Sequence, residues 1–262
     1  MSAEALDVLI RIVVALPFGM AVGSFLTVVI HRMPAGGSLV HPRSSCPSCG
    51  TEIANRDNVP VLSWLFLRGR CRTCGAPISA VYPLTELATG ALFVATALAF
   101  DDPWIVVALC AFLALMPAVA AIDIAHHIIP NRLMYPALLA FPPLLLVARL
   151  AGAPVDLVGA AIGFVAYGGG LLLVALISRG MGMGDVKLAG VIGVVLGALG
   201  LRYVGVAAGA AIVLGGVGGL AALLLGRSRK DAIPFGPFMA AGATLAVFLG
   251  DRLAATYLGL YR

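Results

Sequence analysis

The sequence predicts an all-α protein, a bundle of about eight membrane-spanning helices that carries a small polar loop domain. The mean hydropathy is +1.05 and only 11% of the 262 residues are charged, a composition typical of polytopic membrane proteins. Apolar stretches long enough to cross a bilayer recur along the chain. One long polar stretch, residues 31–82, interrupts them early.

Eight apolar segments are expected to form the membrane helices. They lie at about residues 8–30, 83–100, 103–122, 133–150, 157–178, 186–201, 203–226 and 237–256. The expected domains are a first helix at 1–30, the polar loop at 31–82 and a membrane-embedded domain at 83–262. The start of the chain carries Glu4 and Asp7 instead of a basic cluster, so no cleavable signal peptide is expected.

The basic residues predict the orientation of the bundle. Six arginines lie in the polar loop, namely Arg32, Arg43, Arg56, Arg68, Arg70 and Arg72. With this loop in the cytoplasm, the inner side also holds Arg132, Arg179, Lys187, Arg227, Arg229 and Lys230, and the outer side holds Arg11, Arg149, Arg202, Arg252 and Arg262. Twelve inner against five outer basic residues fits the excess of positive charge on cytoplasmic loops. A nucleic-acid partner would also explain a basic loop, but attachment to a membrane helix disfavours it.

Four of the five cysteines predict a metal site in the polar loop. They form the pairs Cys46/Cys49 and Cys71/Cys74, each followed by glycine, whereas Cys110 lies alone in an apolar run. Two such turns supply four thiolates in a tetrahedron, the closed site of structural zinc. Reducing conditions in the cytoplasm argue against disulfides, and two redox dithiols remain the alternative. Zinc would then stabilise the fold of the loop and leave no coordination position open for water.

Two aspartates lie at the inner edges of long apolar segments. Asp123 occurs in Ala-Ile-Asp-Ile-Ala-His-His-Ile-Ile-Pro (121–130), and Asp185 in Gly-Met-Gly-Asp-Val-Lys-Leu (182–188). A carboxylate at a bilayer boundary is costly, so it is a candidate functional residue. The predicted orientation places both on the cytoplasmic edge. Two such carboxylates that share a proton can activate water, which is the chemistry of an aspartic protease.

Each aspartate also has a simpler explanation. Asp123 alone fits a helix-terminal carboxylate exposed to headgroup water, and Asp185 fits an N-cap. Beside Asp185, Gly182 and Gly184 permit backbone approaches that a Cβ would block. Lys187 is expected to extend to the interface, with substrate contact as the alternative.

Two further features of the membrane region have ordinary explanations. The adjacent His126 and His127 point in different directions on a helix, so they are not expected to form a ligand pair. Gly193 and Gly197 form a small-xxx-small pair, which predicts close helix packing.

Six segments, in order along the chain, resemble one protein family. They are residues 23–32, 58–64, 67–72, 82–86, 182–188 and 233–238. Together they resemble the bacterial type IV prepilin leader peptidases, polytopic aspartic proteases with a Gly-x-Gly-Asp motif. The chain departs from the family pattern at Thr27, where Asn is usual, and at Ala125 and Asn131, where acidic residues are common.

The resemblance implies cleavage of leader peptides from type IV prepilins or type II secretion pseudopilins at the cytoplasmic face of the bacterial inner membrane. It carries Asp123 and Asp185 over as catalytic residues, with Gly182, Gly184 and Lys187 supporting the site. Many members also methylate the new N-terminal amine with S-adenosylmethionine, an activity attached to the N-terminal cytoplasmic half that this chain contains.

Two other functions remain open on the sequence alone. Intramembrane aspartates act as proton relays in proton-coupled carriers, although a carrier would not need the four-cysteine loop. A non-enzymatic assembly scaffold is the second alternative, with the zinc domain binding a partner. Substitution of each aspartate discriminates among the three, because only the protease would lose peptide-bond hydrolysis.

Overall fold

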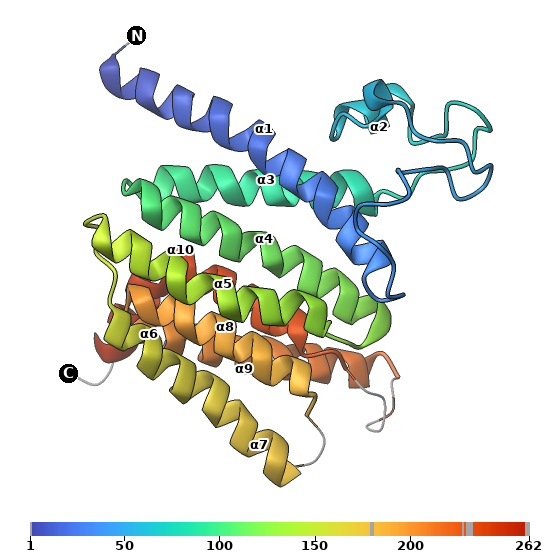
Figure 1. Cartoon of the computed structure of the whole chain (residues 1–262). Helices are drawn as coiled ribbons and strands as arrows, with labels where there is room; N and C mark the ends of the chain where they lie inside the picture. The colour runs from blue at the N-terminus through green and yellow to red at the C-terminus, as the bar shows by residue number, and fades with distance from the viewer. Residues whose placement is uncertain (1, 179–180, 227, 229–232, 260–262) are drawn as a thin grey trace. The chain divides into compact units, whose positions relative to one another are not determined.

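The computed structural model describes residues 2–178, 181–226, 228 and 233–259. These residues form helices, and two isolated β-bridges are the only strand-like pairings among them. The predicted all-α class is thus confirmed (Figure 1). The chain divides into two compact units, Met1–Asp101 and Asp102–Arg262. Five of the basic residues used to predict the orientation lie outside the described residues, namely Arg179, Arg227, Arg229, Lys230 and Arg262.

The first unit contains two long helices and the polar loop between them. Its helices are α1 (Ala3–Arg32), the 3-10 turn η1 (Asn55–Asp57), α2 (Leu62–Phe66) and α3 (Val81–Ala99). Small residues let α1 and α3 pack closely. A Cβ at Gly19 would lie 2.8 Å from Gly90 Cα, and one at Gly23 would lie 2.7 Å from Glu86 Cα. Gly19 and Gly23 therefore form a second small-xxx-small pair, which the sequence analysis did not identify.

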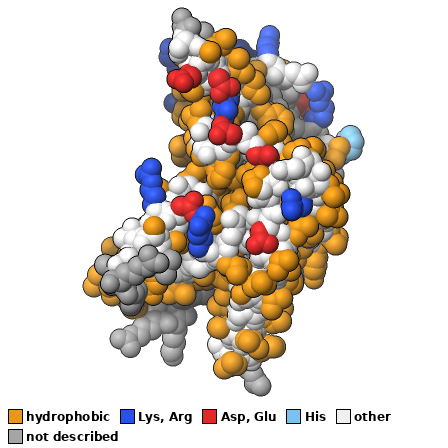
Figure 2. All heavy atoms as spheres, turned by 90° about the vertical axis from the view of Figure 1, so that its left-hand side faces the viewer, with side chains coloured by type: hydrophobic (Ala, Val, Ile, Leu, Met, Phe, Trp, Pro, Cys, Tyr) orange, Lys and Arg blue, Asp and Glu red, His pale blue; other side chains and the backbone are white. Residues whose placement is uncertain are grey.

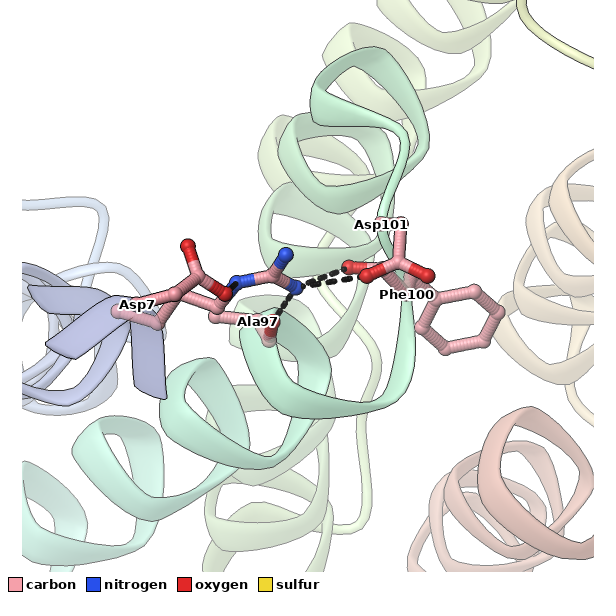
Figure 3. A network of polar contacts seen from close by, with 5 residues as sticks. Asp7, Ala97, Phe100 and Asp101 are labelled. Atoms are coloured by element: carbon pink, nitrogen blue, oxygen red, sulfur yellow. Dashed lines mark hydrogen bonds and ion pairs between the residues drawn. The ribbon is translucent and has the colours of Figure 1, made fainter. Parts of the chain in front are cut away.

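An arginine network joins the N-terminal part of α1 to the residues that follow α3 (Figure 3). Arg11 Nε lies 2.8 Å from an Asp7 carboxylate oxygen, and Nη1 donates to Asp101 at 3.0 Å. The same Nη1 donates to the carbonyl of Ala97 at 3.0 Å and to that of Phe100 at 3.4 Å. These contacts satisfy the last carbonyls of α3, which lack partners within the helix.

The second unit is a bundle of long apolar helices. They are α4 (Pro103–His126), α5 (Asn131–Leu150), α6 (Leu157–Gly163), the π-helical segment η2 (Phe164–Gly169), α7 (Gly170–Ser178), α8 (Met183–Leu199), α9 (Leu201–Leu224) and α10 (Gly236–Gly259). Helix α8 is central, because it packs against α5, α6, η2, α9 and α10. Its residues from 188 to 198 are buried.

Glycines allow the close packing of α8 against α6 and η2. A Cβ at Gly193 would overlap the carbonyl oxygen of Gly163, and one at Gly197 would overlap that of Gly159. The packing role predicted for Gly193 and Gly197 is therefore confirmed.

Seven of the described helices are long and apolar enough to cross a membrane, counting residues 157–178 as one. The eighth predicted span, 186–201, corresponds to α8, whose 17 residues extend about 25 Å. Large apolar side chains face outward, for example Leu139 (77% exposed), Ile177 (84%) and Leu224 (80%). Apolar side chains also cover much of the face in Figure 2. Such a surface suits lipid, so the chain is a multi-pass membrane protein.

Candidate active site and metal centre

Asp123 lies in the last turn of α4, where the helix stops. His127 adopts a left-handed conformation (φ 54°, ψ 37°), and its amide donates to the Asp123 carbonyl at 2.8 Å. Pro130, with φ −65° and ψ 131°, then sets the extended entry to α5. The Asp123 side chain is only 5% exposed, so the alternative of a carboxylate open to headgroup water is wrong.

The start of α10 contacts the Asp123 carboxylate directly. The backbone amide of Gly236 donates to Asp123 Oδ2 at 2.8 Å. A Cβ at Gly236 would lie 2.7 Å from the same oxygen, closer than real Cβ atoms come to their neighbours. Only glycine lets the backbone reach the carboxylate here.

Asp185 lies in the first turn of α8, as the third residue of the helix. Gly182 is the N-cap, and the Asp185 carboxylate is hydrogen-bonded to its backbone. The alternative that Asp185 is itself the N-cap is therefore wrong. Its carboxylate is half-buried, and a Cβ at Gly182 would lie 3.3 Å from Oδ2. A carboxylate in this turn interacts favourably with the helix dipole.

Close packing brings the start of α8 to the exit of α4. A Cβ at Gly184 would lie 2.8 Å from Ile129 Cβ and 3.2 Å from the Ile129 carbonyl oxygen. The predicted close approach at Gly184 is thus present. As a result, the carboxylates of Asp185 and Asp123 interact electrostatically. Asp123 belongs to α4 and Asp185 to α8, so the packing of these elements brings the two carboxylates into one site.

Lys187 points toward α5. Its Nζ donates to Asn131 Oδ1 at 2.6 Å and lies 4.7 Å from the centroid of the Tyr135 ring. The side chain is half-buried, so this contact replaces a simple extension into the headgroup region. Asn131 is one of the positions where the chain departs from the family pattern, and here its amide oxygen binds the lysine.

The two Cys-x-x-Cys turns of the polar loop share one conformation. Gly50 and Gly75 have positive φ angles of 71° and 73°, and their amides donate to the carbonyls of Cys46 and Cys71 at 2.8 and 2.9 Å. No atom lies within 4 Å of a Cβ placed at either glycine, so backbone conformation and not space requires glycine here. Each turn directs its two sulfurs to the same point.

The four sulfurs have the spacing of a tetrahedral metal site. All four Sγ atoms lie within 4.8 Å of one another, and those of Cys46 and Cys74 are 3.8 Å apart. A tetrahedron with Zn–S bonds of about 2.3 Å separates its sulfurs by about 3.8 Å. The donor set therefore fits zinc, and it argues against two independent redox dithiols.

The electrostatics of the cluster also favour a bound cation. Contacts with Thr51, its hydroxyl first (3.4 Å from Sγ) and its backbone second, lower the pKa of the Cys49 thiol to about 6. At Cys74 the backbone of Ala76 lowers the pKa, but burial and the neighbouring thiols outweigh it and raise the pKa to about 11. Four thiolates at this spacing repel one another, and a divalent cation removes that conflict.

An ion pair between Arg72 and Asp57 stabilises the turn that holds Cys71 and Cys74. Arg72, between Cys71 and Cys74, donates from Nε and Nη2 to the two carboxylate oxygens of Asp57 at 2.8 and 2.6 Å. These hydrogen bonds, with the charge of Arg72, hold the pKa of Asp57 below its ordinary value. Such bidentate geometry fixes both partners, so η1 is tied to the metal-binding turn.

Two family models match the chain along most of its length. The first, described as the bacterial peptidase A24 N-terminal domain, matches residues 17–100, and the second, the type IV leader peptidase family, matches residues 107–224. A prepilin leader peptidase/N-methyltransferase of Bacillus subtilis is 37% identical over 92% of this chain and 95% of its own length. The chain belongs to the type IV leader peptidase family.

Proteins of the same name from other bacteria are also similar to this chain. The one from Burkholderia pseudomallei is 36% identical over 94% of this chain and 88% of its own length, and the one from Aeromonas hydrophila is 35% identical over 92% and 91%. No solved structure matches the chain. The two family models fall within the two compact units, one in each.

Two residues at the aspartate site were not predicted from the sequence. Gly236 was noted only within the segment 233–238, and Tyr167 was not noted at all. Tyr167 is buried in the π-helical segment η2 and interacts electrostatically with Asp185. The glycine run that follows Tyr167 was the available sequence signal. The π-helical turn itself points to function, because short π segments are frequent at functional sites.

Proposed function

We propose that this chain cleaves the leader peptide of prepilins or pseudopilins with Asp123 and Asp185 as its catalytic pair. The observation that supports this best is the convergence of two carboxylates from α4 and α8, one buried and bonded to a backbone amide, the other half-buried. The names of the relatives, prepilin leader peptidase/N-methyltransferase, supply the substrate class.

The pair acts by activating water. Two interacting carboxylates share one proton, so their acid and base roles belong to the pair. The ionised carboxylate takes a proton from water as its oxygen attacks the scissile carbonyl carbon. The protonated partner donates a hydrogen bond to the carbonyl oxygen and then gives its proton to the leaving amine. The products are the leader with a new carboxylate and the mature pilin with a new amine.

The residues around the pair hold it in place for this chemistry. Gly236 fixes one oxygen of Asp123, and Gly182 and Gly184 allow the start of α8 to approach it. Lys187, held by Asn131, adds a positive charge two residues from Asp185. A displacement of about 1 Å at such a site can cost about 100-fold in rate, so these backbone contacts belong to the proposed machinery.

The second proposed activity is N-methylation of the new amine, for which the relatives' names are the support. S-adenosylmethionine would supply the methyl group, and no residue of the chain is assigned to it. Zinc held by Cys46, Cys49, Cys71 and Cys74 would be structural, since four sulfur ligands would leave no position of a tetrahedral site open to water.

The proposed location is the bacterial inner membrane, with the aspartates and the zinc loop on the cytoplasmic side, as the distribution of basic residues favours. Within the chain, residues 1–30, 31–82 and 83–262 are proposed to be the first helix, the zinc domain and the protease domain.

One experiment tests both activities. The purified protein is incubated with a candidate prepilin, with and without S-adenosylmethionine, and the product masses are measured. Leader removal in both samples, with one added methyl mass only when the donor is present, is the expected result. A prepilin that stays intact with the wild-type protein but is cut by an established relative would contradict the proposal.

A further inference from the structure

A basic pocket lies between the last turns of α1 and the polar loop. It encloses about 190 Å³ and is lined by ten residues, none of them Asp or Glu. Arg32 and Arg43 bring guanidinium groups to it, and Asn55 and Asn58 bring amides. The pocket therefore fits an anionic ligand.

Both guanidinium groups are held in place by the loop. Arg32 Nη1 donates to the carbonyls of Ser38 and Pro42 at 3.2 and 2.8 Å. Arg43 Nη2 donates to Asn55 Oδ1 at 2.8 Å. A guanidinium carries five N–H donors, and these bonds use one nitrogen of each. Each arginine is thus preorganised and keeps donors for the oxygens of an anion.

The position of Arg32 sets the depth of the pocket in the membrane. Between Arg11 and Arg32, residues 12–31 carry no Asp, Glu, Lys or Arg. These twenty helical residues extend about 30 Å, the thickness of the hydrocarbon core. Arg11 marks one boundary of the uncharged part of α1, and Arg32 marks the other. The pocket therefore lies at the level of the lipid headgroups.

The remaining walls of the pocket suit the upper part of an acyl chain. Val28 lies one turn before Arg32, on the hydrocarbon side, and Leu39 and Val40 come from the loop. Val40 is 73% exposed. An apolar wall on the membrane side and two arginines at the headgroup level form a combination that suits a lipid better than a free anion.

We propose that this pocket binds the phosphate of an anionic phospholipid of the same leaflet, with Arg32 and Arg43 on the phosphate and Val28, Leu39 and Val40 against the glycerol and acyl chain. The bound lipid would tie the polar loop to the membrane surface. The proposal does not depend on the aspartates or on the protease activity.

The test measures lipid retention by the full-length protein. Protein in detergent micelles is mixed with equal amounts of phosphatidylglycerol and phosphatidylcholine, and native mass spectrometry counts the lipids that each protein keeps. The variants are Arg43→Gln and the double variant Arg32→Gln/Arg43→Gln. Arg68→Gln/Arg70→Gln is the matched control, because both control arginines are exposed in the same loop and do not line the pocket.

The wild-type protein should keep one phosphatidylglycerol in preference to phosphatidylcholine. Retention should weaken about fivefold for each arginine removed, and the control should match the wild type. Arg32 also donates to two loop carbonyls. If the double variant binds less zinc than the wild type, Arg43→Gln alone decides the test. Equal retention of both lipids, or an equal loss in the control, would overturn the proposal. So would displacement of the lipid by millimolar inorganic phosphate, which would mark a site for soluble anions.

Discussion

The amide of Gly236 and the carboxylate of Asp123 form a hydrogen bond of 2.8 Å across 113 residues of sequence. The contact needs glycine, because a Cβ at this position would lie 2.7 Å from Oδ2 and 3.2 Å from Cγ of Asp123. It places the start of α10 against the carboxylate that ends α4. The position of Asp123 in the proposed catalytic pair thus depends on a residue that has no side chain.

The substitution Gly236→Ala is expected to lower leader cleavage about 100-fold, because the added methyl group must displace the Asp123 carboxylate. Gly209→Ala in α9 is the matched control, since no atom lies within 4 Å of a Cβ there. Cleavage rates of a purified prepilin measure the effect, and expression and thermal unfolding show whether each variant is folded. Wild-type cleavage by Gly236→Ala would show that the contact is dispensable.

Asp123→Asn and Asp185→Asn are each expected to abolish cleavage while expression and membrane insertion stay near normal. An amide cannot accept or donate the proton of the cycle, a loss of about 10²–10⁴-fold for acid–base catalysis. Asp251→Asn is the control. Asp251 accepts a hydrogen bond from the Tyr203 hydroxyl and forms an ion pair with Arg202, and it is not part of the proposed catalytic pair. Preserved cleavage in either test variant would refute the assignment of that aspartate.

Hydropathy and motif order predicted the helices and both candidate sites, because a membrane helix must be apolar over its whole length. They could not predict the hydrogen bond between Gly236 and Asp123, since no local pattern encodes a contact between residues so far apart. The π-helical form of η2, which holds Tyr167, was missed for a related reason. An apolar run of this kind fits an α-helix equally well.

The simpler explanations of the two aspartates, an exposed Asp123 and an N-cap at Asp185, also could not be tested from local sequence. Whether Asp123 is exposed depends on α10, which covers it, and whether Asp185 caps α8 depends on where that helix begins. Helix ends are the least certain part of any reading of a sequence. The cysteine pairs were more informative, because their spacing and following glycines already describe the turn.

The polar loop is expected to bind one zinc ion per chain. Elemental analysis measures the zinc content of the wild type and of two variants. The test variant has serine at Cys46, Cys49, Cys71 and Cys74, and Cys110→Ser is the control. Equal zinc in the fourfold variant would refute the site.

Chelation of the zinc should also change the fluorescence of Trp64, whose Nε1 donates to the carbonyl of Ile78 at 3.1 Å, before cleavage is affected. A Trp104→Phe background makes Trp64 the sole emitter, since the chain has 2 tryptophans.

Asp57→Asn is expected to release zinc to a chelator faster than the wild type, because Arg72 loses its bidentate partner beside Cys71. The pKa of Asp57 is lowered in the folded protein. The stabilisation that its carboxylate gives is therefore complete above its unfolded-state pKa of about 3.9, and it is lost as pH falls through the folded-state pKa. The ratio of the two release rates should therefore stay constant from pH 5.5 to pH 7.5. Glu52→Gln, which alters an exposed carboxylate of the same loop, should behave like the wild type. A ratio that approaches one by pH 5.5 would contradict this account.

The two proposed activities are expected to be separable. Cleavage depends on Asp123 and Asp185, whereas the zinc loop contains no residue of the proposed catalytic pair. The fourfold cysteine variant should therefore lose methyl transfer to a greater extent than cleavage, as mass spectrometry of the mature pilin N-terminus would record. The converse test uses a pilin peptide whose leader has already been removed.

With this pre-cleaved peptide, Asp185→Asn should still add the methyl group, because the amine no longer has to be released by hydrolysis. The same variant should leave an intact prepilin both uncut and unmethylated. Two results would contradict the separation. One is a folded cysteine variant that has lost all cleavage, since the loop would then take part in proteolysis. The other is an Asp185→Asn protein that cannot methylate the pre-cleaved peptide, since the aspartate would then serve both reactions.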